Sequence, residues 1–273
     1  MFHIEYENLQ HIFDYTFMQH AFIAGTFAAI LASITGYFMA LRNLTFAGHA
    51  LSHVGFAGAA AAGLAGVSPL LGQLLITILA ALGMGSLNEQ VRRNDFIIGI
   101  ILALTLGLGS LFLHFYNSYA GQTTSLLFGD LLGVSSSAIK TIAFLTIGCI
   151  LALAIIARPM LFASIEIDLA EAKGVPVNKL TSVFLIIMAI AVTLASQVVG
   201  VLLVFTLLIG PAAIALQWTR TFWMGILSTV ILSVSIVWIS IVLTYLTDWP
   251  ISFWISCLVF IGYLIGNIYK AYR

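Results

Sequence analysis

Two histidines in an apolar stretch rich in small residues are the clearest candidates for chemistry in this sequence. His49 and His53 lie in the run GHALSHVGFAG, and their spacing places both on one face of a helix. Measured from Arg42, which we expect at a membrane surface, His49 lies ~10 Å and His53 ~16 Å along the helix axis. A hydrocarbon core is ~30 Å thick, so His53 would lie near its middle. Imidazoles at that depth are costly unless they face an ion, a partner or a cavity.

The histidine pair is suited to a divalent cation. Neutral imidazole binds zinc, nickel, copper and iron well, and manganese less well. Two imidazoles one helical turn apart supply half of a tetrahedral donor set, which other helices can complete. The alternative is a packed helix–helix interface in which both rings are hydrogen-bonded to Ser52, Gln73 or the backbone. The spacing and depth of the pair favour a site or gate for the ion.

A carboxylate in a short apolar segment is the next candidate. Asp130 lies within Ser125–Ser137, which is too short and too interrupted to cross a membrane alone. We expect a half-helix or re-entrant segment, which must pack against protein or line a cavity. Asp130 could donate a metal ligand, or it could cap a helix in a solvated vestibule. The sequence leaves both interpretations open.

The composition identifies an all-α, polytopic membrane protein. Of 273 residues, 62% are hydrophobic and only 7% are charged, which excludes a soluble domain. The apolar runs have helix length and lack the alternation of a membrane barrel. The net charge is zero and the cationic residues are scattered, so nothing indicates nucleic-acid binding. No GxxxxGK[ST] loop is present, and the chain by itself cannot hydrolyse ATP.

The apolar runs predict nine spans in a single transmembrane domain, residues 1–273, in contact with membrane lipid. They cover about 20–41, 45–67, 70–87, 96–116, 138–156, 180–194, 199–216, 222–246 and 251–269. With residues 1–19 outside and the C-terminus in the cytoplasm, Lys140 is the only lysine or arginine outside. This agrees with the positive-inside rule. A different division near Gln197–Gly200 would give eight spans.

The longest polar interruption, residues 160–179, is predicted to be a cytoplasmic loop. Its charged residues fit one short amphipathic helix: Glu166, Asp168, Glu171 and Lys173. Gly174 and Pro176 would end that helix. An exposed helix in a protein with few loops suggests a docking surface for a partner, and a solvated connector is the alternative.

Four stretches together resemble the permease subunits of ATP-binding-cassette importers for zinc, manganese or iron. They occur in the expected order: GHALSHVGFAG (48–58), LLFGDLLGVS (126–135), LAEAKGVPVNKL (169–180) and VVGVLLVFTLLIGPAAIA (198–215). The resemblance implies a pair of permeases forming one pathway in a prokaryotic plasma membrane. It also implies cytoplasmic ATPase subunits that bind ATP, an extracytoplasmic metal-binding protein, and no permanently bound cofactor in the permease.

The resemblance also suggests roles for particular residues. Leu169–Pro176 matches the coupling helix that docks into the ATPase, centred on Glu171, Lys173 and Gly174. His53 matches a histidine of such permeases, whereas His49 stands where they commonly have an aspartate. Imidazole in place of a hard oxygen donor should shift the preference from manganese towards zinc.

Three other functions are alternatives to an ATP-driven metal importer. A secondary carrier could move the metal with protons, and would then work without an ATPase. A siderophore- or vitamin-class importer would make the histidine pair incidental. An intramembrane enzyme is disfavoured because the pair lacks the glutamate of HExxH and no GxSxG-type motif occurs.

Overall fold

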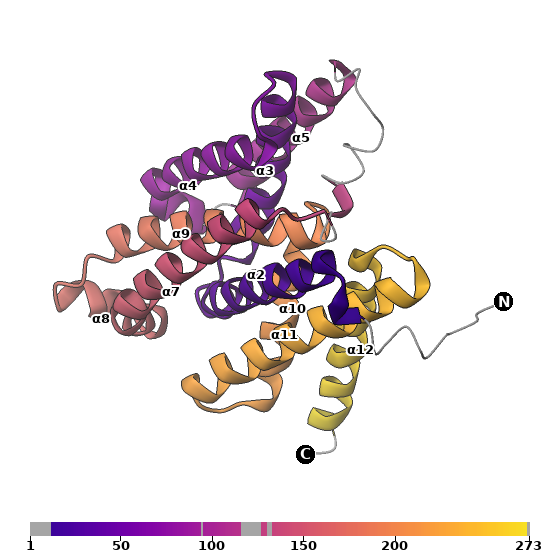
Figure 1. Ribbon diagram of the computed structural model, residues 1–273. Helices are drawn as coiled ribbons and strands as arrows, with labels where there is room; N and C mark the ends of the chain where they lie inside the picture. Colours follow the sequence, from indigo (N-terminus) through magenta and orange to yellow (C-terminus); the bar gives the residue numbers. More distant parts are fainter. Residues whose placement is uncertain (1–11, 94, 116–126, 130–132, 272–273) are drawn as a thin grey trace.

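The computed structural model describes residues 12–93, 95–115, 127–129 and 133–271, and these ranges contain helices and turns but no strand (Figure 1). The long helices are α2 (Thr16–Leu41), α3 (Thr45–Leu64), α4 (Pro69–Arg93), α5 (Asp95–Phe115), α7 (Ser136–Ile165), α9 (Val177–Val199), α10 (Val204–Trp218), α11 (Phe222–Thr247) and α12 (Ile251–Ala271). Two short elements are η1 (Ile12–Asp14) and α8 (Ile167–Ala172).

The predicted all-helical membrane architecture is confirmed. Seven helices are long and apolar enough to cross a membrane, namely α2, α4, α5, α7, α9, α11 and α12. The other two long helices, α10 and α3, are not among these seven, and their sequences show why. Helix α10 has only 15 residues, and α3 is built from small residues and carries the two histidines. In their order along the chain these nine helices correspond to the nine predicted spans, and seven of them have the length and hydropathy of a span.

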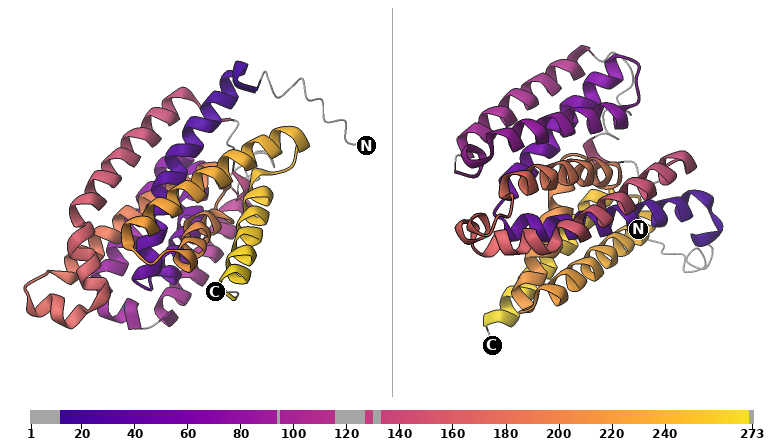
Figure 2. Two further views of the ribbon diagram at one scale, coloured as in Figure 1. Left: turned by 90° about the horizontal axis from the view of Figure 1, so that it is seen from below. Right: turned by 90° about the vertical axis from the view of Figure 1, so that its left-hand side faces the viewer.

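The helices form three groups. Helices α3, α4 and α5 pack together on one side, α10, α11 and α12 lie on the other, and α2, α7 and α9 lie between them (Figures 1 and 2). Helices α2 and α9 are the centre of the fold, because 72% of the most apolar 18-residue stretch of each is buried, against 11% for the corresponding stretch of α5. This arrangement places α3 between α5 and the central helices.

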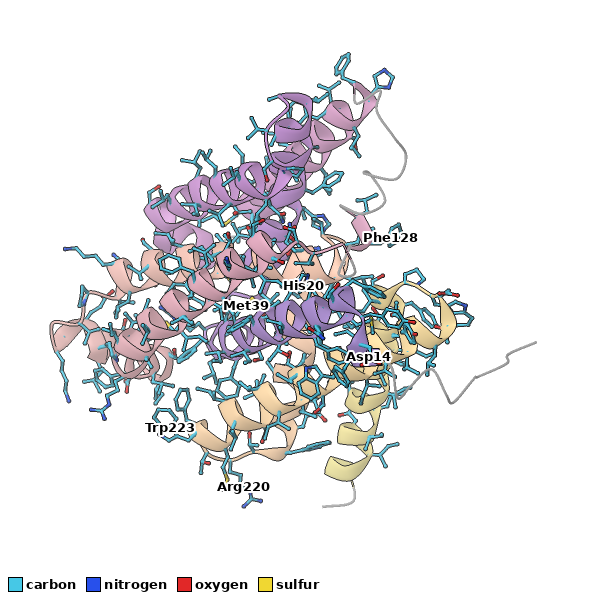
Figure 3. The ribbon with its side chains drawn as sticks, viewed as in Figure 1. Asp14, His20, Met39, Phe128, Arg220 and Trp223 are labelled. Carbon is cyan, nitrogen blue, oxygen red and sulfur yellow. The ribbon has the colours of Figure 1, made fainter. Side chains whose placement is uncertain are left out.

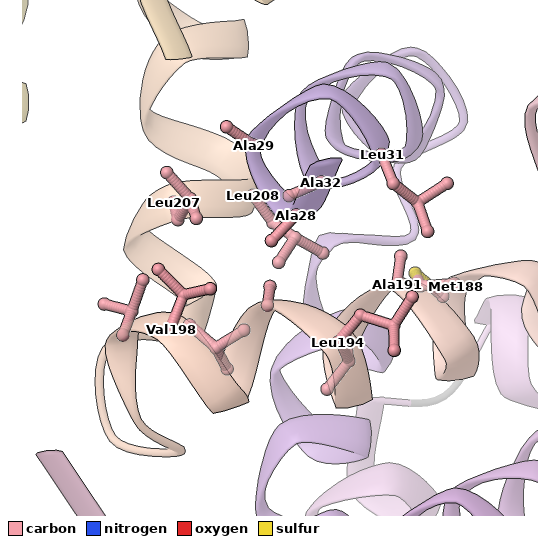
Figure 4. Packing of buried hydrophobic residues seen from close by; sticks show 14 of the residues in the cluster. Ala28, Ala29, Leu31, Ala32, Met188, Ala191, Leu194, Val198, Leu207 and Leu208 are labelled. Carbon is pink, nitrogen blue, oxygen red and sulfur yellow. The ribbon is translucent and has the colours of Figure 1, made fainter. Parts of the chain in front are cut away.

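Small residues allow the central helices to approach closely. Ala28 and Ala32 of α2 are buried beside Leu194 of α9 and Leu208 of α10 (Figure 4). Membrane helices have no hydrophobic driving force between them, so close van der Waals contact through small residues holds them together. Gly36 of α2 is the extreme case, since a Cβ there would overlap the backbone of Leu208.

Helix α7 is longer than the sequence predicted. We expected the span to end at Ile156, before Arg158 and Pro159, but the helix continues through Pro159 to Ile165. Proline removes one backbone donor and crowds the preceding turn, so it normally ends or kinks a helix. Here Met160 is fully buried on the far side of the proline, and this packing sustains the helix. The polar connector predicted from residue 160 therefore begins only after α7.

The predicted division between the sixth and seventh spans is confirmed. Helix α9 ends at Val199, Gly200 adopts φ 82° and ψ 159°, and α10 begins at Val204. Only glycine adopts this backbone region readily, so Gly200 interrupts what would otherwise be one long apolar helix. The count is nine long helices rather than eight among the described residues.

Candidate metal site

The histidine pair lies on one face of α3, as predicted. The ring centroids of His49 and His53 are 4.8 Å apart, and the ring planes stand at 86° to each other. Both residues are half-buried, and the helix that carries them consists otherwise of apolar and small residues. The spacing therefore brings the two imidazoles close enough to contact one ion in turn or together.

His49 faces an open pocket of about 300 Å³ beside α10. Thr45, Phe46 and Phe205 line this pocket with His49, and the Phe205 ring lies 5.0 Å from the His49 ring. The Nδ1 atom of His49 is buried and has no hydrogen-bond partner among the described residues. A buried unpaired ring nitrogen is costly, and a metal ion is one ligand that would satisfy it.

The two side chains that the alternative interpretation assigned to the rings, Ser52 and Gln73, bond to other groups. Ser52 Oγ donates to the Gly48 carbonyl of its own helix, at 3.0 Å. Gln73 Nε2 donates to Ser196 Oγ at 2.6 Å, on α9. Both side chains that could have bonded the rings are thus engaged elsewhere.

The described part of one chain offers two imidazoles for a metal ion. Among the described residues, no group of three or more histidine, cysteine, aspartate or glutamate side chains could hold a metal ion. The third predicted ligand, Asp130, lies outside the described residues. Two donors alone would hold a metal ion only weakly.

The segment beside Asp130 is tied to the break between α9 and α10. Leu202 N donates to the Leu127 carbonyl at 3.3 Å, and Phe128 marks this segment in Figure 3. Gly129 and Gly200 both have positive φ and cross closely, because a Cβ on Gly129 would lie 2.7 Å from the Gly200 nitrogen. Residues 127–129 of the short apolar segment therefore pack against protein where the long apolar stretch is interrupted, as backbone in a half-inserted segment must.

The predicted amphipathic helix before α9 is present. It is α8, a helix of six residues, followed by Lys173 as C-cap and by Gly174 at φ 80°. Glu171 and Lys173 are exposed, and Lys173 Nζ lies 5.4 Å from the centre of the Phe162 ring. Pro176 is the N-cap of α9. These four residues form one exposed corner between α7 and α9.

Two buried polar connections were not predicted. One is a seam between α4 and α9, in which Gln73 contacts Ser196 and Thr77 Oγ1 lies 3.1 Å from Thr193 Oγ1. Polar residues recur one turn apart on each of these helices, and that spacing was a signal for the seam. The other connection joins Arg42 to Thr181, and no local pattern indicates it.

Comparison with known proteins gives a family and a fold. The pattern of the ABC 3 transport family matches residues 14–270. The manganese transport system membrane protein MntC of Listeria monocytogenes is 32% identical over 208 residues, which cover 76% of this chain and 74% of that protein. The high-affinity zinc uptake system membrane protein ZnuB of Haemophilus influenzae is 26% identical over 205 residues, covering 74% of this chain and 77% of that protein.

A solved structure shares the fold. PsaBC from Streptococcus pneumoniae, in complex with Fab, contains a chain that superposes with a TM-score of 0.85 at 23% identity. The match covers 95% of this chain and 94% of that chain. The arrangement of helices around the histidine pair is therefore a known one.

Proposed function

Because this chain belongs to the ABC 3 transport family, we propose that it is the membrane-spanning permease of an importer that moves a divalent transition-metal ion into the cytoplasm. The observation that carries the proposal is the His49–His53 pair, with a buried, unpartnered ring nitrogen beside an open pocket. Zinc transport, the named function of one relative, agrees with imidazole ligation, whereas manganese, for which another relative is named, binds imidazole less well.

Two copies of the chain would complete the donor set. Each copy brings two imidazoles, and four nitrogen donors from facing copies would suit the tetrahedral preference of zinc. A site shared between two subunits can also be dismantled when they move apart. Transport requires this property, because an ion held in a permanent cage would not be released.

The energy for transport would come from partner chains. We place α8 and the following corner, Glu171 to Pro176, against cytoplasmic ATPase subunits that bind ATP. An extracytoplasmic metal-binding protein would deliver the ion at the opposite face, where Asp130 could help to receive it. This topology sets residues 1–19 outside and the C-terminus in the cytoplasm of a prokaryotic cell.

We propose zinc as the preferred cargo. Among the relatives whose names give a metal, most are named for manganese and one for zinc, so the names by themselves do not support a preference for zinc. The side chain at position 49 does bear on the choice of metal, because an imidazole there, together with His53, gives two nitrogen donors where an aspartate would give an oxygen donor. Nitrogen donors suit zinc, whereas manganese prefers carboxylate oxygens.

Uptake by the reconstituted complex tests the function and the cargo together. The chain, its ATPase and its binding protein are placed in liposomes, and zinc and manganese uptake are measured with and without ATP. We expect ATP-dependent zinc uptake, and we expect His49→Asp to shift the preference towards manganese. An unchanged zinc preference in His49→Asp would show that donor type at this position does not select the metal.

Substitution of the second histidine tests the site itself. We expect His53→Ala to lower zinc uptake at least tenfold, since losing even a residue that only supports a ligand costs roughly 10–100-fold in affinity. His114→Ala is the matched control, because His114 is an exposed histidine at the end of α5. Uptake without an ATPase, driven by a proton gradient, would instead identify a secondary carrier.

A further inference from the structure

A row of buried contacts leads from α8 to the first residue of α9. Ala170 of α8 is fully buried and packs in a small cluster with Ala163 of α7 and Val177 of α9. Each of these three side chains is at most 3% exposed. A close-packed cluster of this kind transmits displacement, because a shift of α8 cannot be absorbed by empty space.

The row continues through two polar side chains that are also buried. Thr181 Oγ1 donates to the Val177 carbonyl at 2.9 Å, and Arg42 Nη2 donates to the same Thr181 oxygen at 2.9 Å. Arg42 is only 9% exposed, although it ends a membrane helix at a position that we expected to be at the surface. Burial of a guanidinium is expensive unless its hydrogen bonds are well placed, so this geometry is strongly specified.

Arg42 is also the start of the turn into the histidine helix. It is the C-cap of α2, and Asn43 beside it adopts a left-handed conformation with φ 54°. Leu44 N bonds to the Met39 carbonyl at 3.0 Å, and Gly48 N bonds to the Leu44 carbonyl at 3.1 Å. The turn is therefore short and held by backbone hydrogen bonds, and His49 lies in the first two turns of the helix that follows it.

Helix α9 touches the histidine helix at a second point. A Cβ at Gly48 would overlap Met39 Sδ of α2, which is labelled in Figure 3, and would lie 3.3 Å from Met188 Sδ of α9. The α3 backbone next to His49 is thus enclosed by α2 and α9 with no space for a side chain. A displacement of α9 would reach α3 both through Arg42 and through Met188.

We propose that the Arg42–Thr181 hydrogen bond links the α8–α9 corner to the histidine helix, and that it makes transport of the ion depend on movement of α8. The inference rests on the proposed function and adds to it. Arg42 and Thr181 are positioning residues, which do not touch the ion and act through the placement of α3. Their loss should separate ATP hydrolysis from transport and leave metal binding intact.

The test is the ratio of zinc transported to ATP hydrolysed by the full complex in liposomes. We expect Thr181→Val, which removes the acceptor for the guanidinium, to lower this ratio about tenfold, the factor that corresponds to one hydrogen bond to a charged group. Zinc affinity of the purified permease and the rate of ATP hydrolysis should not change. Arg42→Lys, which keeps the charge but loses the planar donor geometry, should have the same effect.

Two further variants separate the linkage from general damage. Thr181→Ser keeps the hydroxyl and should restore the ratio. Thr229→Val is the matched control and should leave the ratio unchanged, because Thr229 is likewise buried and bonds to the carbonyl one turn before it, but lies on α11.

Each remaining outcome has a distinct meaning. An unchanged transport ratio in Thr181→Val and Arg42→Lys would overturn the linkage, and so would a loss of zinc affinity in step with the loss of uptake. Absence of ATP-driven zinc uptake by the wild-type complex would refute the proposed function itself. That result is obtained from the wild type alone, before any variant is compared.

Discussion

Replacement of Gly200 by alanine should be one of the most damaging single-methyl substitutions in this protein. Gly200 separates α9 from α10 and has φ 82° and ψ 159°. Its Cα faces the short segment before α7, and a Cβ would lie 2.5 Å from the Gly129 nitrogen and would overlap the Leu127 carbonyl. The methyl group would therefore meet two penalties at once, from its own backbone conformation and from a neighbouring backbone that cannot rotate away.

The two penalties can be estimated separately. A non-glycine residue in this region of backbone space costs about 1–3 kcal/mol. Forcing an extra carbon into a closely packed contact costs typically about 1–3 kcal/mol more. We therefore expect a loss of stability of roughly 2–6 kcal/mol, which corresponds to a fall in unfolding temperature of roughly 5–20 °C for a chain of this size.

The assay is thermal unfolding of the detergent-purified chain, with two glycine controls. Gly174→Ala tests the backbone penalty alone, because Gly174 has φ 80° and no described atom lies within 4 Å of a Cβ there. We expect it to cost about 1 kcal/mol. Gly83→Ala, inside α4 and equally open among the described residues, should stabilise the protein by about 0.5–1 kcal/mol.

The ranking of the three variants by stability tests whether Gly129 and Gly200 cross closely in the folded protein. If Gly200→Ala is no more destabilising than Gly174→Ala, the close crossing of Gly129 and Gly200 does not exist in the folded protein. The short apolar segment would then not be anchored at the break between α9 and α10.

Two other substitutions are expected to change the stability of the protein in opposite directions. Pro159→Ala should stabilise α7 by about 1–3 kcal/mol, because the helix continues past this point and alanine restores the backbone donor that the Ile155 carbonyl lacks. An unfolding temperature below that of the wild type would contradict this expectation. Gln73→Leu should destabilise the protein by about 1 kcal/mol, because it removes the hydrogen bond to Ser196. Hydrogen bonds between membrane helices average about 0.6 and reach about 1.7 kcal/mol. Equal stability in the same assay would show that the polar seam between α4 and α9 does not stabilise the protein.

The number of helices and the face shared by the histidines could be predicted because both depend on local pattern. Runs of apolar residues of helix length define the spans, and residues four apart share a face whatever the helix packs against. Gly200 marked a helix boundary for the same local reason, since backbone conformation there depends on the residue itself.

The features that were missed depend on residues far apart in the sequence. Pro159 indicated a helix end, but burial of Met160 against other elements outweighs that local signal. Arg42 was expected at the membrane surface, whereas its partner Thr181 lies 139 residues further along the chain. Neither contact leaves a periodic pattern that could be recognised before the helices are assembled.

The central position of α2 and α9 has a consequence for biogenesis. Helix α2 emerges from the ribosome early, but the α9 surface that covers Ala28 and Ala32 emerges only after four further long helices. Until then the small-residue face of α2 must be covered by lipid or by a temporary partner, and Arg42 lacks its threonine acceptor. A chain that stops before α9 would therefore leave an incompletely paired arginine at the membrane boundary, which is a feature that cellular quality control can recognise.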